Sequence, residues 1–300
     1  MSMMRNIMKN FFLGLTLLLG MKGFAQIDKL NRAITLHQSK NADAARLVID
    51  SVIRHAETKG DPMVWTTRAY IYFEIYKRSE KSKLNSPLRD TIISSVKQSN
   101  ALKPDADYQN NNNKLIYNLA VGLYNISINI LQDSINAERS LKAYNRSKEL
   151  TKTVKPDSVF TKADVEYYNT VGAIYSDIFN RDNNDTKAQE TAKVALLKVL
   201  ELQPDNVRAN LNLGIMYYNQ AVNLGKTLDY GADISQIDVI QESMIKLAKK
   251  SEQLIDRVYK KDPKNLKAVE ALYFIYRMLN DYAKTDEFNK KCTDNGIKLD

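Results

Sequence analysis

The sequence predicts an all-α fold built from about six antiparallel helical hairpins. The chain has 300 residues but only 10 Gly and 6 Pro, which are few breakers for a fold with many turns. Apolar residues recur at three- and four-residue spacings, whereas the strict alternation typical of half-buried strands is hard to find. In addition, a phrase in which a tyrosine stands three residues after a small residue recurs along the chain.

The first 25 residues have a different character from the rest. Arg5 and Lys9 stand before or at the edge of the apolar run FFLGLTLLLG, and the small residues of GFA directly precede Gln26. This order is typical of a Sec signal peptide that is cleaved after Ala25. The apolar run is far shorter than the roughly 20 residues that a membrane-spanning helix needs. No cysteine lies near the cleavage point, which argues against a lipoprotein anchor.

We therefore expect residues 1–25 to be a signal peptide and residues 26–300 to form one exported helical domain. No later stretch is apolar enough to span a membrane, so the chain is predicted not to be membrane-spanning. The expected location is the periplasm of a Gram-negative bacterium, with secretion as the alternative.

The recurring phrase marks the first helix of each successive hairpin. Its clearest copy has Leu213, Gly214 and Tyr217 a few residues after Pro204. A small residue such as Gly214 lets two helices approach closely, and a proline ends the helix before it. In the last copy Tyr273 replaces the small residue, so we expect that helix pair to pack less closely. The five copies are anchored on Trp65, Ile116, Tyr168, Asn210 and Val269.

The second helices lie between these copies. The helix that leads to Pro204 carries Ala192, Leu196 and Val199 on one face. The most regular one, at 236–260, is preceded by Asp233, which with Gln236 predicts a capping box. A further helix over 26–37 would open the first hairpin. The predicted second helices span Asn41–Thr58, Thr91–Leu102, Ala137–Leu150, Lys187–Leu202 and Gln236–Lys260.

Taken together, these positions resemble the tetratricopeptide repeat, whose pattern is W-x2-L-G-x2-Y, then A-x3-F, then Pro. The resemblance implies an α-solenoid, a superhelix whose first helices line a concave groove suited to holding a partner. The copies are 42 to 59 residues apart, which is more than the ideal 34. Longer helices or wider loops must take up the difference, and three polar insertions are the candidates: Lys77–Pro87, Asn180–Lys187 and Asn223–Asp233.

Composition and motifs give little support for catalysis. His37 and His55 are the only histidines and Cys292 is the only cysteine, so a metal site is not expected. The sequence contains no G-x-S-x-G, H-E-x-x-H or P-loop motif. Loss of residues 1–25 would remove three of the 44 basic residues and leave 41 against 35 acidic ones, in interleaved order. We therefore predict no enzyme activity, no cofactor and no nucleic-acid partner.

The candidate binding residues recur at equal offsets in two of the predicted first helices. The family resemblance implies that these positions face the groove, where an asparagine amide suits an extended peptide backbone and a basic residue suits a carboxylate. The spacing of the family's carboxylate clamp is not reproduced. The alternative explanation of the recurrence is shared ancestry of two repeats, with the asparagines tolerated on a solvated face. The candidates are Lys114, Asn118 and Asn125 in one helix and Arg208, Asn212 and Asn219 in the other.

Two functions follow from this reading. The first is an exported, non-catalytic scaffold that holds a partner protein or an extended peptide segment in its groove. The alternative is an envelope protein that binds carbohydrate or another small ligand. Aromatic stacking would favour the second function, but five of the 17 tyrosines are more simply explained as part of the repeat core: Tyr70, Tyr72, Tyr175, Tyr217 and Tyr276.

Overall fold

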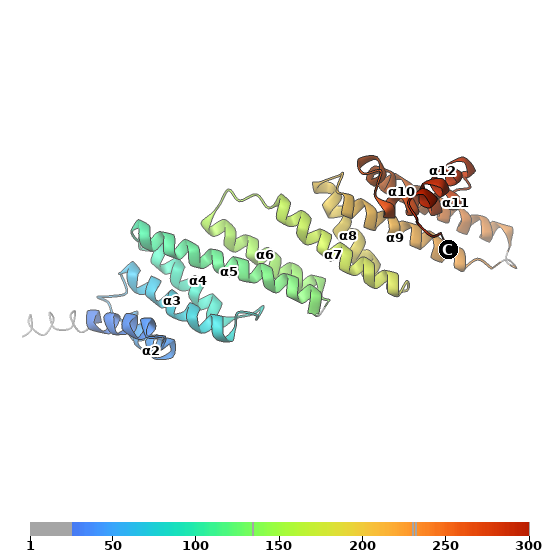
Figure 1. Cartoon of the computed structure of the whole chain (residues 1–300). Coiled ribbons are helices and arrows are strands. Elements are labelled where there is room, and N and C mark those ends of the chain that lie inside the picture. Colours follow the sequence, from blue (N-terminus) through green and yellow to red (C-terminus); the bar gives the residue numbers. More distant parts are fainter. Residues whose placement is uncertain (1–25, 134, 230, 232, 300) are drawn as a thin grey trace, which may run out of the picture. The chain divides into compact units, whose positions relative to one another are not determined.

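The computed structural model describes residues 26–133, 135–229, 231 and 233–299. The predicted signal peptide therefore lies outside the described residues. In the described part every regular element is a helix, and successive pairs of helices pack as antiparallel hairpins (Figure 1). The all-α prediction and the TPR-like hairpin array are confirmed.

The chain divides into two compact units, one that ends at Ser158 and one that begins at Val159. The first unit opens with a helix over residues 26–38. It then contains α2 (Ala42–Val52), α3 (Pro62–Ser79), α4 (Pro87–Ala101), α5 (Ala106–Asp133) and α6 (Ala137–Val154). The second unit contains α7 (Thr161–Arg181), α8 (Thr186–Leu202), α9 (Val207–Lys226), α10 (Ile234–Lys261), α11 (Leu266–Met278) and α12 (Tyr282–Asp294).

Each unit has its own apolar core. In the first unit the buried residues of α3 to α6 form one cluster, and Leu30 and Ala33 pack with α2 and α3 in another. In the second unit, a core cluster joins α10, α11 and α12, with partly buried side chains of α9 packed against it. The hairpins thus bury the apolar stripe that the sequence pattern predicts for each helix.

Small residues set the close approach within two hairpins, as predicted. A Cβ added to Gly172 would lie 2.5 Å from Cδ2 of Leu196, and one added to Gly214 would lie 2.6 Å from Cδ1 of Ile255. Ser251 Oγ also donates a 2.7 Å hydrogen bond to the carbonyl of Gly214. The helices approach so closely that a side chain on one reaches the backbone of the other.

The extra residues of the repeats are absorbed mainly by longer helices. α5 and α10 each have 28 residues, and α10 begins at Ile234, before the predicted start. In contrast, α2 ends at Val52, six residues before the end that the sequence pattern predicts. Asp233 is the N-cap residue of α10, but its side chain makes no cap hydrogen bond, so the predicted capping box is wrong.

Candidate functional site

The first candidate trio lies on the exposed side of α5. Lys114, Asn118 and Asn125 are exposed, and within the described residues their side chains make no hydrogen bond or ion pair. Offsets of four and eleven residues bring them within about 40° of one another around the helix. Tyr117 and Val121 lie along the same side and are 44% and 42% exposed. We call these five residues the α5 stripe.

Two hollows flank the α5 stripe. One, of about 350 Å³, lies between α5 and the end of α6 and is lined by Lys114, Tyr117 and Lys155, among others. The other, of about 340 Å³, lies between α3 and α5, where Asn118 and Asn125 face Phe73, Lys77 and Lys81. The structure therefore brings all three predicted α5 residues to the walls of surface hollows.

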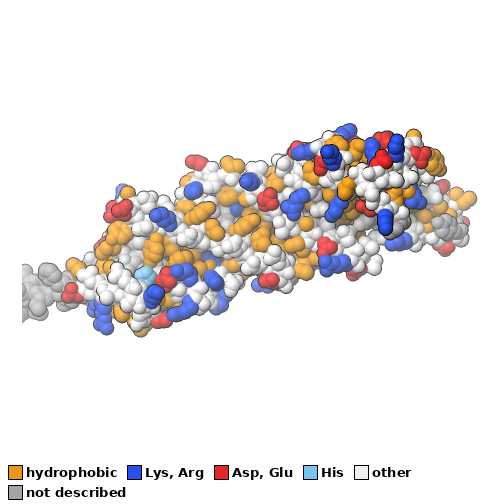
Figure 2. Space-filling view, viewed as in Figure 1, with side chains coloured by type: hydrophobic (Ala, Val, Ile, Leu, Met, Phe, Trp, Pro, Cys, Tyr) orange, Lys and Arg blue, Asp and Glu red, His pale blue; other side chains and the backbone are white. Residues whose placement is uncertain are grey.

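The electrostatic character of these hollows is basic. Lys155 lies over the ring of Tyr117 at 5.2 Å from its centroid, and Lys77 lies over Phe73 while pairing with Glu74. Lys81 and Lys114 have no ion pair within the described residues. Three lysines thus surround an exposed, partly apolar stripe that contains a fourth, Lys114, and this arrangement favours acidic or polar chains over basic ones. On the face drawn in Figure 2, basic and acidic side chains are interspersed.

The second candidate trio lies on α9, and two of its three side chains contact α7. Arg208 pairs with Glu166 of α7 at 3.8 Å, although both side chains are more than half exposed. Asn219 donates a 2.9 Å hydrogen bond to the side-chain oxygen of Asn180, at the other end of α7. Asn212, between them, is half-buried. These contacts tie α9 to α7, so the two trios have different surroundings despite their equal spacing.

Several other asparagines are structural. Asn112 is buried, and its side-chain amide donates to Ser99 Oγ at 3.0 Å and to Asn100 Oδ1 at 2.8 Å. The hydroxyl of Thr66 donates to Asn112 Oδ1 at 3.1 Å. Asn210 is also buried and donates at 2.9 Å to the carbonyl of Pro204, which fixes the turn before α9. These contacts explain why asparagine, a poor helix former, is kept at both positions. No such contact explains Asn118 and Asn125 within the described residues.

Two tyrosines that the repeat pattern places in the core are only partly buried. Tyr217 is half-buried, with Lys250 at 5.5 Å from its ring centroid, in contrast to the buried Tyr175 at the matching position. Tyr70 donates a 3.1 Å hydrogen bond to the carbonyl of Asn111, and burial raises the pKa of its hydroxyl. The hydroxyl therefore stays protonated and joins α3 to the first half of α5.

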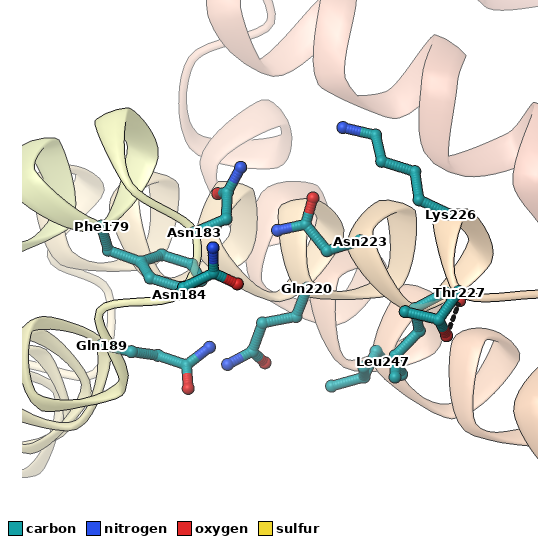
Figure 3. Close-up of a pocket in the computed structure, with 10 residues that line it drawn as sticks. Phe179, Asn183, Asn184, Gln189, Gln220, Asn223, Lys226, Thr227 and Leu247 are labelled. Atoms are coloured by element: carbon teal, nitrogen blue, oxygen red, sulfur yellow. Dashed lines mark hydrogen bonds between the residues drawn. The ribbon is translucent and has the colours of Figure 1, made fainter.

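The sequence pattern did not point to a third and larger hollow, which lies within the second unit (Figure 3). Its volume is about 590 Å³, and amide side chains from α8, α9 and the α7–α8 turn dominate its polar lining. We call it the amide cavity. Its lining residues fall partly in two of the predicted polar insertions, Asn180–Lys187 and Asn223–Asp233, and these insertions were the available signal. The lining residues are Phe179, Asn183, Asn184, Gln189, Gln220, Asn223, Leu224, Lys226, Thr227 and Leu247.

Chemistry-bearing side chains are sparse in the described part of the chain. No group of three or more His, Cys, Asp or Glu residues there is arranged to hold a metal ion. Cys292 is buried in the last hairpin, and this burial raises the pKa of its thiol. A protonated, enclosed thiol reacts slowly, because the thiolate is the nucleophile.

None of the helices formed by the described residues combines the length and apolar content that crossing a bilayer requires.

Comparison with known proteins places the resemblance at the level of fold. No family model matches the chain, and a search of curated proteins finds no match. The type IV pilus biogenesis factor PilW aligns over 92% of this chain and 96% of its own, with 13% identity and a TM-score of 0.31. The S. pombe nuclear import adaptor Nro1 aligns over 92% and 96%, with 14% identity and a TM-score of 0.35.

A monomeric mutant of IFIT1 with Gppp-AAAA aligns over 84% of this chain and 46% of that chain, with 16% identity and a TM-score of 0.37. All three are TPR-type helical repeat proteins. Because these TM-scores are low, the fold of this chain rests on its own hairpin packing.

Proposed function

We propose that the chain is an exported, non-catalytic TPR-like scaffold that binds an extended segment of a partner protein along the α5 stripe. A TPR-like array of helical hairpins supports a protein-interaction scaffold in general. The observation that carries the proposal is the α5 stripe itself. Its asparagines and lysine are exposed and lack partners in the described residues, and they flank two exposed apolar side chains.

The stripe suits an extended chain for two reasons. Asn118 and Asn125 each offer an amide donor and acceptor to a peptide backbone, and they are spaced along the helix rather than gathered at one point. Tyr117 and Val121 offer apolar contact between them, where burial on binding is favourable. The surrounding lysines give the partner segment its expected character, which is acidic and polar with scattered apolar residues.

Photo-crosslinking from the stripe tests this function. Replacing Tyr117 with a photo-crosslinking phenylalanine analogue in the native cell envelope should yield one dominant partner, crosslinked through an acidic, non-helical segment. The control is the same analogue at Tyr282, which is 76% exposed on α12. If both positions crosslink the same proteins, or if neither yields a specific product, the stripe is not a binding surface.

Export is a separate part of the proposal and rests on the order of residues before Gln26. Mass spectrometry of the protein isolated from its native cells should find Gln26, free or cyclised, at the N-terminus. Material that retains Met1 and fractionates with the cytosol would contradict export while leaving the binding function open to its own test.

We also propose the α9 trio, which lies in the second unit, as a separate contact point for a partner segment. Its members recur at the offsets of the α5 trio, and Asn212 has no hydrogen bond within the described residues. Because Arg208 and Asn219 already contact α7, we expect substitutions there to weaken partner binding less than substitutions on α5.

A further inference from the structure

The amide cavity combines polar groups that no neighbouring side chain satisfies. The side chains of Asn183, Gln189, Gln220 and Asn223 make no hydrogen bond within the described residues. Figure 3 shows the amides of Gln189 and Gln220 pointing toward one another across the cavity, with Asn184 and Asn223 beside the same space. Each amide carries one carbonyl acceptor and two N–H donors, so the walls can both donate and accept.

Charge is nearly absent from the lining of this cavity. Lys226 is the one charged side chain among the lining residues that the structure describes, and it is exposed at the end of α9. No carboxylate contributes to that lining. A cationic ligand or a metal ion would therefore lose its hydration without gaining a counter-charge, which is costly. Figure 3 shows the side chain of Lys226 pointing away from the amides of Gln189 and Gln220, so a ligand held by these amides meets no charged group. The lining therefore favours an uncharged, hydrogen-bonding ligand.

The remaining walls of the cavity are apolar. Phe179, which is 2% exposed overall, lines the cavity from α7, and the partly buried Leu224 and Leu247 line it from α9 and α10. A ligand that fits must therefore present apolar C–H surface as well as hydroxyl or amide groups. A sugar ring has both, since its hydroxyl edge and its C–H face are separate. The cavity volume of about 590 Å³ lies in the range typical of small-ligand sites, and its amides converge instead of following a line.

We propose that the amide cavity is a binding site for a neutral saccharide, with Gln220 and Asn223 of α9 as its main hydrogen-bonding residues. Both lie on the same helix, three residues apart, and therefore face the same side. Gln189 approaches from α8, and the turn residues Asn183 and Asn184 close the opposite wall. This site lies wholly within the second unit and is independent of the α5 stripe.

A glycan array that carries neutral and acidic oligosaccharides tests the proposal with the full purified chain. The expected result is binding to a subset of the neutral glycans, and the strongest of these is then titrated by calorimetry. The double variant Gln220→Ala/Asn223→Ala should weaken that binding about tenfold or more, because two buried ligand hydrogen bonds are lost. The matched control, Gln253→Ala/Asn289→Ala, removes the same two amide types from exposed positions of α10 and α12 and should bind normally.

Three outcomes would overturn the proposal: no neutral glycan binds, acidic glycans bind in preference, or the cavity variant binds as tightly as the control. Neutral, asparagine-rich peptides printed on the same array serve as a competing class of ligand. Preferential binding of those peptides in a Gln220- and Asn223-dependent way would assign the cavity to a peptide instead of a saccharide. Thermal melts that coincide for both double variants separate lost binding from lost folding. The variant Lys114→Ala/Asn118→Ala/Asn125→Ala should keep full glycan binding. A failure of the α5 proposal can therefore be distinguished from a failure of the saccharide proposal.

Discussion

Asparagine has three separate roles in this chain: it caps helices, it forms hydrogen bonds in the core, and it lies exposed on the surface. Four asparagines begin helices, because their side chains accept a hydrogen bond from the first turn: Asn41, Asn136, Asn206 and Asn265. Others, such as Asn112 and Asn210, are buried and bonded to their surroundings. Sequence spacing alone does not separate these structural asparagines from exposed ones such as Asn118, since burial depends on the packing of distant helices.

Close packing at Gly214 gives the first prediction at the residue scale. Gly214→Leu should destabilise the chain by roughly 1–3 kcal/mol or more, because the new side chain meets Ile255 with no free space. Gly60→Leu is the control, since a Cβ at Gly60 would have no neighbour within 4 Å. Thermal melts of the two variants make the comparison. Equal midpoints would show that the helix pair at Gly214 is not tightly packed.

Arg89 gives a second prediction, and nothing in the repeat pattern indicated it. Its side chain is completely buried and donates to the carbonyls of Lys83 and Leu84 at 2.7 and 2.9 Å and to Tyr76 Oη at 3.1 Å. Arg89→Met should lower the free energy of unfolding by about 2–4 kcal/mol, because charge-assisted hydrogen bonds are lost and buried acceptors are left unpaired.

Urea denaturation measures this cost, and Arg78→Met provides the matched control. Arg78 pairs with Asp43 at 2.8 Å on an exposed surface, where such pairs contribute about 1 kcal/mol or less. A similar small loss in both variants would mean that Arg89 does not hold the α3–α4 loop in place.

At the scale of elements, helix existence and order were predictable, whereas helix ends were not. The small-x-x-Tyr phrase located α7 and α9 well, since a close helix approach needs a small residue. The ends depended on features that the pattern does not specify. Asp61 and Ser86 each cap a helix that begins with a proline, and the predicted start at Thr91 lay four residues beyond Pro87.

The start of α4 gives a pH-dependent prediction. Glu80 accepts hydrogen bonds from Ser86 Oγ at 2.7 Å and Lys83 Nζ at 3.1 Å, and these contacts hold the pKa of its carboxyl below the ordinary value of 4.5. A lowered pKa means that the folded state favours the carboxylate. The contribution to stability is therefore present above the unfolded-state pKa and is lost as pH falls through the folded-state pKa.

Comparison of the wild-type chain with Glu80→Gln in urea, from pH 7 down to about pH 3, tests this dependence. The wild-type chain should be the more stable at neutral pH, and the difference should shrink once the pH falls below 4.5. A difference that stays constant across this range would show that the Glu80 carboxylate does not contribute through its charge.

At the scale of the whole molecule, the sequence predicted repeats but not cavities. The hairpin array follows from short-range periodicity, which one chain carries in full. A cavity requires side chains from several hairpins, and the amide cavity joins the end of α7 to α9 and α10. The stripe on α5 was predictable because all its residues lie on one helix. The different surroundings of the α9 trio were not, because they depend on Glu166 and Asn180 of α7.

The central claim of this account is that the exposed asparagines and lysine of the α5 stripe bind a partner segment without stabilising the fold. Exposed substitutions usually change the free energy of unfolding by about 0.5 kcal/mol or less. The variant that tests the α5 stripe is Lys114→Ala/Asn118→Ala/Asn125→Ala. A second variant combines Asn118→Ala and Asn125→Ala with Asn212→Ala and Asn219→Ala, and so extends the test to the α9 trio. The matched control is Lys142→Ala/Asn145→Ala on the exposed side of α6.

The most direct test is the affinity of the crosslinked partner segment, as a synthetic peptide, for these chains. Lys114→Ala/Asn118→Ala/Asn125→Ala should weaken binding about tenfold or more with an unchanged melting temperature, while the α6 control binds as the wild type does. Full affinity in the α5 variant, and also in the variant with all four asparagines replaced, would contradict the account and leave the shared asparagines as a trace of repeat duplication.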